Sequence, residues 1–263
     1  MQFVVGVDMR ISVATTCGIL ISVALFSHAL AEPLEDADAA HDRGEYSIAL
    51  SIISPLARQG DAGAQRRMGD FYASGKGVPA DYDEAEKWFL RAAAQGDLDA
   101  MWNIGFIHER GRGNFKKDFS EGEKWYLRAA EHGHLLSQMT LASRYAGGDG
   151  VERDESMAAK WYERAANQGD FLAQFTLGMI YESGQGVPQD RVLAYKWLNL
   201  AASHATPRTP NAANAIKRMS QTLDVTNFKD ALEIRDLLYR EMTPSQRAEA
   251  QKLTREWRAK VER

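Results

Sequence analysis

Few groups in this chain are spaced for catalysis or metal binding, and each has a structural explanation. His108-Glu109 begins like the zinc motif H-E-x-x-H, but Arg112 stands where that motif needs its second histidine. His132 and His134 form the only close histidine pair, and we expect them near a helix C-terminus, where partial negative charge favours imidazole. No Ser-x-x-Lys occurs together with the Ser-Asp-Asn or Lys-Thr-Gly partners of a β-lactamase-like site.

Other recurring groups have roles in helix and turn formation. Four aspartates recur at a nearly constant interval and fit the N-cap of a helix better than a catalytic pair: Asp81, Asp118, Asp154 and Asp190. Glycine pairs such as Gly75-Lys76-Gly77 lack the spacing of a phosphate-binding loop. The sequence therefore predicts a protein that is not an enzyme, with no cofactor and no metal.

The same spacing reveals an internal repeat. A Trp-aromatic-x-x-Ala-Ala segment recurs four times, with leucine in place of the aromatic in the last copy, and its tryptophans are 37, 36 and 36 residues apart: Trp88, Trp125, Trp161 and Trp197. Periods of this length indicate an array of small units, each too small to bury its own apolar face. Such arrays mostly provide surfaces that hold other molecules.

Each copy is predicted to be a helix–turn–helix hairpin. In the fourth copy, Asp170 caps a helix over 171–183, Gly184 ends it, and Asp190 caps a second helix over 191–204. Gly178, which recurs as Gly69 and Gly105, leaves no side chain on the buried face and lets a neighbouring helix approach closely. The second copy departs most, because Gly122 replaces a mid-helix alanine, and we expect the array to be softest there or its turn to be adapted for a contact.

These residues resemble the Sel-one-like repeat family, a relative of the tetratricopeptide repeat. The shared pattern is A-x-x-x-L-G-x-x-Y-x-x-G-x-G-V, then D, then A-x-x-W-Y-x-x-A-A-x-x-G, over residues 61–204. The resemblance implies an all-α, right-handed solenoid of antiparallel helix pairs, and it implies an adaptor or scaffold role. Some relatives have been described as β-lactamase-like, but they are cysteine-rich.

We expect four kinds of segment along the chain. They are a signal peptide (1–31), a degenerate helical hairpin (32–60), four repeats (61–96, 97–133, 134–169 and 170–204) and a C-terminal helical cap (205–263). Thr243-Pro244-Ser245-Gln246 is a capping box that begins the last helix. The alternative for this C-terminal region is a docking module that carries Trp257.

The first 31 residues have the pattern of a secretory signal. Arg10 is followed by an apolar run over 11–26 and by an Ala29-Leu30-Ala31 cleavage site; Met9 is an alternative start. The apolar run is short for a membrane anchor, so we expect cleavage after Ala31 and a periplasmic product. The only cysteine, Cys17, lies in this segment, so the mature chain has no disulfide and no thiol nucleophile.

The net charge of the chain and its distribution indicate which kinds of partner it can bind. The chain carries a net charge of −4, with an acidic repeat region and a C-terminal segment that is net positive. An acidic array argues against nucleic acid, which needs a clustered basic face, and we expect no stable membrane insertion after cleavage. The expected partner is a protein of unknown identity.

Candidate binding residues come from columns of the first helix that vary between copies. One column holds Arg67, Asn103, Thr140 and Thr176, and another holds Asp70, Phe106, Ser143 and Met179. We expect Arg67, Asp70, Asn103, Phe106, Thr140 and Met179 to face a ligand on the concave surface, with Phe106 and Met179 as apolar anchors. The alternative is that Phe106 and Met179 pack between repeats.

The sequence thus predicts a periplasmic, non-enzymatic scaffold that binds a partner along its concave face, in envelope assembly or signalling. One alternative is a periplasmic hydrolase of β-lactam or cell-wall substrates. Another is a binder of envelope polysaccharide that uses Trp102 as a stacking platform.

Overall fold

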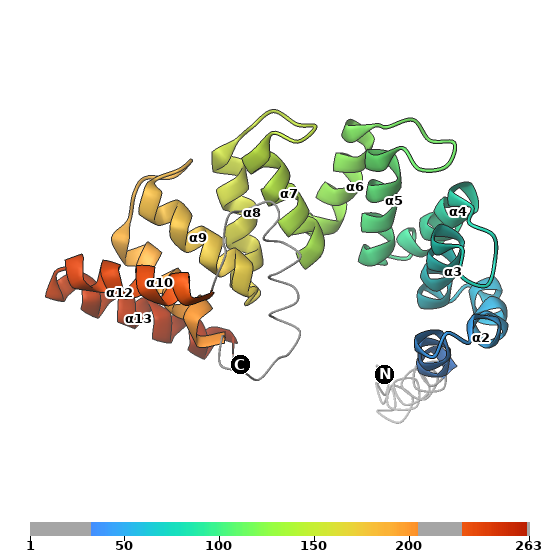
Figure 1. The fold of residues 1–263 in the computed structure, drawn as a ribbon, viewed down its shortest axis with the longest axis horizontal. Coiled ribbons are helices and arrows are strands. Elements are labelled where there is room, and N and C mark those ends of the chain that lie inside the picture. The colour runs from blue at the N-terminus through green and yellow to red at the C-terminus, as the bar shows by residue number, and fades with distance from the viewer. Residues whose placement is uncertain (1–32, 205–227, 262–263) are drawn as a thin grey trace, which may run out of the picture. The chain divides into compact units, whose positions relative to one another are not determined.

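The computed structural model describes residues 33–204 and 228–261, and every regular element in these ranges is a helix (Figure 1). The predicted signal peptide and the first part of the predicted C-terminal cap, residues 205–227, lie outside the described residues. After a helix over 33–42, the elements are α2 (Tyr46–Gln59), α3 (Ala62–Ser74), α4 (Tyr82–Ala93), α5 (Leu98–Arg110), α6 (Phe119–Glu131), α7 (Leu135–Gly147), α8 (Glu155–Asn167), α9 (Phe171–Ser183), α10 (Arg191–His204), α12 (Phe228–Glu241) and α13 (Pro244–Val261).

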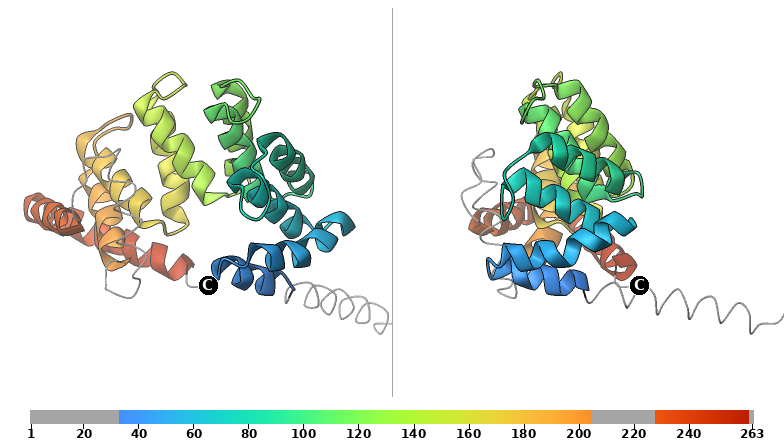
Figure 2. Two further views of the ribbon diagram at one scale, coloured as in Figure 1. Left: turned by 45° about the vertical axis from the view of Figure 1, so that its right-hand side comes forward. Right: turned by 90° about the vertical axis from the view of Figure 1, so that its right-hand side faces the viewer.

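The chain divides into two compact units, residues 1–100 and 101–263, with the boundary inside α5. In the first unit α3 packs between α2 and α4. In the second unit each helix from α6 to α10 packs against the next one along the chain, as the views in Figures 1 and 2 show. The predicted all-α array of antiparallel helix pairs is confirmed.

The predicted aspartate caps form. In the fourth copy the Asp170 carboxylate accepts a hydrogen bond from the Ala173 amide at 2.7 Å, and the Asp190 carboxylate accepts one from Leu193 at 3.0 Å. The bounds predicted for both helices of this copy agree with α9 and α10. His134, the weakest cap of the series, makes no side-chain bond to the α7 backbone, and its Nδ1 lies 2.8 Å from Ser137 Oγ instead.

Glycine occupies two kinds of closely packed position in the hairpins, although the third copy has Ala142 at the first kind. The first kind lets the paired helices touch: a Cβ placed on Gly69 would lie 2.5 Å from the Phe89 ring, and one on Gly178 would lie 2.7 Å from Leu198. The second kind is the later glycine of each turn, which has a positive φ and packs against the hairpin before it. A Cβ on Gly186, for example, would lie 2.3 Å from the Glu155 backbone.

Consecutive hairpins are also joined by glutamine side chains, which the repeat pattern had not indicated; Gln65 and Gln138 are buried, whereas Gln95 and Gln168 are exposed. Gln138 Nε2 donates to the Ala130 carbonyl at 3.0 Å, and Gln168 Nε2 donates to Gln138 Oε1 at 2.7 Å. The first unit repeats this arrangement with Gln65 and Gln95. Because a buried amide must be paired, these contacts fix the offset of one hairpin against the next.

The C-terminal helices cover the last hairpin. Both α12 and α13 pack on α10 (Figure 2), and the capping box forms, with Gln246 N donating to Thr243 Oγ1 at 3.3 Å. The Trp257 ring meets the Trp197 ring edge-on at 6.4 Å, and its Nε1 donates to Asn167 Oδ1 at 3.2 Å. In the preceding copies the repeat tryptophan is covered by an arginine three residues later, such as Arg164 over Trp161, where the fourth copy has Leu200.

Within the described ranges, the helices are too short or too polar to cross a membrane.

Candidate functional site

The six predicted site residues are divided between the two units. Arg67 and Asp70 lie on α3 in the first unit, while Asn103, Phe106, Thr140 and Met179 belong to the second. Arg67 forms an ion pair with Asp38 of the helix over 33–42, so it joins two helices of its own unit.

Asp70 lies in a cluster of opposite charges. Arg66 Nη1 pairs with its carboxylate at 3.2 Å, and Arg66 Nε also lies 3.4 Å from Asp97 Oδ2 and 3.7 Å from Asp99 Oδ2. Burial raises the pKa of Asp70 to about 6, against the opposing effect of Arg66 and Arg67. The side chain is therefore partly protonated at mildly acidic pH.

Phe106 and Thr140 meet at one aromatic residue. The Phe106 ring stacks on Trp102, one turn earlier on α5, with centroids 5.5 Å apart and an interplanar angle of 18°. Trp102 Nε1 donates to Thr140 Oγ1 on α7 at 3.2 Å, and the Thr140 hydroxyl donates in turn to the Leu136 carbonyl at 2.8 Å. The Leu136 side chain is 46 % exposed. We call Trp102, Phe106, Leu136 and Thr140 the aromatic patch.

Arg110 extends the aromatic patch by another turn. Its guanidinium lies over the Phe106 ring, 5.6 Å from the centroid, and its side chain is mostly exposed. Two half-buried aromatic rings and an arginine are side chains that protein-binding surfaces favour.

Met179 and Thr176 lie in a different environment. Met179 packs against a buried cluster that includes Phe175 of its own helix, Leu198 of α10 and Leu238 of α12. Thr176 is only 8 % exposed. The column that contains Thr140 is thus half-buried on α7 and buried on α9.

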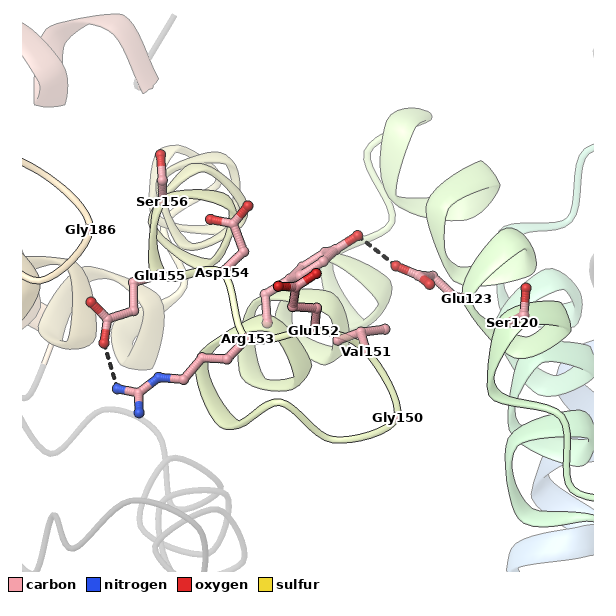
Figure 3. A pocket seen from close by; sticks show the side chains of 11 residues that line it. Ser120, Glu123, Gly150, Val151, Glu152, Arg153, Asp154, Glu155, Ser156 and Gly186 are labelled. Carbon is pink, nitrogen blue, oxygen red and sulfur yellow. Dashed lines mark hydrogen bonds and ion pairs between the residues drawn. The ribbon is translucent and has the colours of Figure 1, made fainter.

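A groove lies among the turns of the second unit (Figure 3). It has a volume of about 890 Å³ and is lined by the start of α6, the turn between α7 and α8, and Gly186 of the next turn. Its lining residues are Ser120, Glu123, Tyr145, Gly150, Val151, Glu152, Arg153, Asp154, Glu155, Ser156 and Gly186. We call it the acidic groove, since four carboxylates and one guanidinium line it.

One side of the acidic groove is held by a tyrosine. Tyr145 Oη donates to Glu123 Oε1 at 2.5 Å, and burial together with this bond raises the pKa of Tyr145 to about 12. On the other side, Arg153 Nη2 pairs with Glu155 Oε1 at 2.5 Å (Figure 3). The sequence pattern did not indicate this groove, because its members come from three successive copies.

Next to the turn between α7 and α8 lies a buried arginine, Arg144, which the sequence pattern did not predict as a functional residue. Arg144 is 5 % exposed, and its guanidinium lies over the rings of Phe119 and Tyr126. Its Nε donates to the Asp149 carbonyl at 3.0 Å, and its Nη1 lies 4.0 Å from Glu109 Oε2. A comparison of the copies could have identified Arg144, because the other copies carry apolar residues at this position: Phe71, Ile107 and Ile180.

The described residues offer no metal site, since no three histidine, cysteine, aspartate or glutamate side chains gather in a way that could hold an ion. The surfaces built here can bind by shape and charge.

A protein-family model matches the repeats of this chain. The Sel1 repeat model matches residues 62–97, 98–134, 136–170 and 172–205, more than half of the chain. The chain belongs to the Sel1 repeat family. Proteins of this family act as scaffolds for protein interactions, and their fold is generally not catalytic.

Two solved Sel1-type structures are similar to this chain. A Sel1 repeat protein from Oxalobacter formigenes is 29 % identical with a TM-score of 0.58, over 66 % of this chain and 71 % of that one. The protein c5321, a protective antigen of uropathogenic Escherichia coli with an SLR fold, is 26 % identical with a TM-score of 0.60, over 91 % of this chain and 47 % of that one.

The curated relatives are much longer proteins. An uncharacterized Sel1-like repeat-containing protein of Schizosaccharomyces pombe is 36 % identical over 77 residues, 29 % of this chain and 11 % of that protein. HRD3A of Arabidopsis thaliana, an ERAD-associated E3 ubiquitin-protein ligase component, is 32 % identical over 72 residues, 27 % of this chain and 11 % of that protein. This Sel1 chain therefore matches about a tenth of the length of either relative.

Proposed function

We propose that this Sel1 repeat protein is an exported, periplasmic scaffold that binds a protein partner through the aromatic patch on α5 and α7. The observation that carries the proposal is the stack of Phe106 on Trp102, which a hydrogen bond joins to Thr140, one turn after the exposed Leu136 on α7. Sel1 family membership supports a scaffold, and the leader-like first 31 residues support export.

The chemistry of the aromatic patch favours a peptide over a sugar ligand. One face of the Trp102 ring is already covered by Phe106, and its only polar atom is engaged by Thr140. Sugar-binding platforms need a free aromatic face with hydrogen-bonding groups around it, whereas an apolar side chain of a partner can pack against the patch edge.

Site-specific photo-crosslinking in the native host tests this proposal. A photoreactive residue at position 106 should give a discrete protein adduct, whereas the same probe at position 237 on α12 should not. Leu237 is a suitable control because it is 57 % exposed and lies outside the patch. Equal labelling at the two positions, or no adduct at 106, would contradict the assignment of the patch.

A substitution completes the test. Phe106→Ala should weaken partner capture about tenfold or more, in line with the loss of an anchor residue, while the helical content stays unchanged. Retention of the purified protein on a column of envelope polysaccharide, lost in the same variant, would instead support the glycan alternative. Fusion of residues 1–40 to a reporter that is active only in the periplasm tests export separately.

A further inference from the structure

The acidic groove is a second surface, and it shares no residue with the aromatic patch. We propose that it binds a lysine- or arginine-bearing segment of a partner protein. The proposal goes beyond the function assigned to the aromatic patch, and either surface can fail its test while the other passes.

The charges of the groove are fixed and largely uncompensated. Arg153 is the only cation in its lining, and it is already paired with Glu155. Asp154 is held in place because its carboxylate accepts a hydrogen bond from the Met157 amide at 2.9 Å and caps α8. The remaining carboxylates give the groove a net negative charge, which attracts cationic side chains and repels anions.

A comparison of the copies shows that one charge has no evident role in the fold. The first and fourth copies have proline after Gly-x-Gly-Val, at Pro79 and Pro188, whereas the third copy has Glu152. The Glu152 side chain is exposed, and none of the described residues forms a hydrogen bond or ion pair with it. A glutamate that replaces a turn-forming proline without any intramolecular contact points to a partner outside the chain.

The turn that lines the groove is anchored to its neighbours. Gly150 packs so closely on α6 that an added Cβ would lie 2.2 Å from the Phe119 ring, and Arg144 Nε donates to the Asp149 carbonyl at 3.0 Å. Contacts that hold a turn in place lower the entropic cost of association.

The lining suits an extended cationic side chain. Val151 and the Tyr145 ring in the lining offer apolar surface for the methylene groups of a lysine or arginine, and the carboxylates of the same lining can receive the charged end. Several such carboxylates along one groove favour a segment with more than one basic residue.

Fluorescence anisotropy with a labelled peptide of alternating lysine and alanine tests the proposal, using the purified protein at low and at physiological ionic strength. Glu152→Lys should weaken binding about tenfold, since it converts an attraction into a repulsion at the groove. Glu131→Lys is the matched control, because Glu131 is exposed at the end of α6 and outside the groove, and it should change affinity less than about twofold.

A second variant separates binding from folding. Glu152→Pro introduces the residue that the first and fourth copies have at this position, so it should leave the melting temperature unchanged. It should still weaken binding of the peptide about threefold. Phe106→Ala should leave peptide affinity unchanged, which keeps this test independent of the aromatic patch.

Three results would overturn the proposal. Equal effects of Glu152→Lys and Glu131→Lys would mean that the peptide senses only the net charge of the chain. Wild-type protein that does not bind the peptide at low ionic strength would exclude a basic ligand. Self-association of the wild type that Glu152→Lys abolishes would make a second copy of this chain the occupant.

Discussion

Arg144 is the residue where this chain departs most from its own repeat. Its column is apolar in the other copies, and a buried guanidinium is stable only when it is paired and hydrogen-bonded. Here the pairing is partial: Glu109 lies 4.0 Å from Nη1, and neither Nη1 nor Nη2 has a hydrogen-bond partner among the described residues. Glu109 itself accepts a hydrogen bond from Tyr126 Oη at 2.8 Å, and burial raises the pKa of Tyr126 far above its ordinary value.

We expect Arg144→Ile to destabilise the protein by about 1–3 kcal/mol, although isoleucine is the residue of two other copies. The loss follows because Glu109 then keeps only the more exposed Arg110 as an ionic partner, and because the Asp149 turn loses its anchor. Urea unfolding measures the change in the free energy of unfolding.

The double variant Arg144→Ile/Glu109→Ala is the control. Alanine stands at the position of Glu109 in the first and third copies, so the pair should recover part of the loss, with a coupling energy of at least about 0.5 kcal/mol. Additive single effects would show that Arg144 and Glu109 do not interact.

Asp70 makes the stability of the first unit depend on pH. Because burial raises its folded pKa to about 6 from an ordinary value of 3.8, the folded state binds this proton more tightly than the unfolded state does. Protonation of Asp70 therefore makes its full contribution to stability below about pH 3.8, and this contribution is lost as the pH rises through 6. The effect is moderated by Arg66 and by the 44 % of the side chain that is exposed.

Carboxyl-detected NMR titration of Asp70 should show a midpoint near pH 6, and Asp70→Asn should flatten the stability profile between pH 4 and 6. Asp38→Asn is the contrasting variant, since its hydrogen bond with Arg67 lowers the pKa of Asp38. An Asp70 midpoint near 3.8 would mean that Arg66 outweighs the burial of the carboxylate.

At the scale of the helix, the packing of α5 against α6 explains why the second copy has Gly122 where the other copies have alanine. Its mid-helix position in α6 predicts a loss of helix stability relative to alanine of about 0.5–1 kcal/mol. In the structure a Cβ on Gly122 would lie 2.8 Å from the Gly105 carbonyl oxygen of α5. The absence of both side chains lets α5 and α6 approach more closely than a Gly–Ala pair would allow.

We therefore expect Gly122→Ala to destabilise the protein by about 1 kcal/mol or more, because the clash involves backbone and exceeds the gain in helix propensity. Thermal unfolding followed by circular dichroism measures the effect. Gly147→Ala is the matched control in α7: its added Cβ would meet only the Asp149 side chain, at 3.4 Å, so it should be neutral or slightly stabilising. A stabilised Gly122→Ala would mean that the helices can separate at no cost.

Periodicity explains why the elements could be predicted while the sites could not. Columns that recur, such as the aspartate caps and the glycines at positions 69, 105 and 178, repeat because every hairpin has the same packing, so one copy predicts the others. The groove and the Arg144 contacts depend on residues from different copies, such as Glu123 and Glu152, whose proximity no single repeat reveals. Met179 shows the same limit, since the cluster that it packs against includes Leu238, which lies outside the repeats.

At the scale of the whole molecule, the array must end without exposing the face of its last hairpin. In a linear array each hairpin is stabilised mainly by its neighbours, and the last one lacks a following repeat. Here α12 and α13 take that place, and Trp257 covers Trp197 where the fourth copy lacks the usual arginine. This packing is expected of a cap, and it leaves Trp257 occupied within the chain by Trp197 and Asn167.

Trp257→Ala should therefore destabilise the protein locally. Because the ring is half-buried, we expect a loss of about 1–3 kcal/mol, below that of a fully buried tryptophan. Hydrogen exchange should accelerate most in α9, α10 and α13 and should not change in α3 and α4, since effects decay along a linear array.

Leu237→Ala, on an exposed position of α12, should change stability by less than about 0.5 kcal/mol. If exchange instead rises equally in every helix, the chain unfolds as one cooperative block. If Trp257→Ala leaves exchange untouched but abolishes capture of a partner, Trp257 belongs to a docking module and the last hairpin is stable without it.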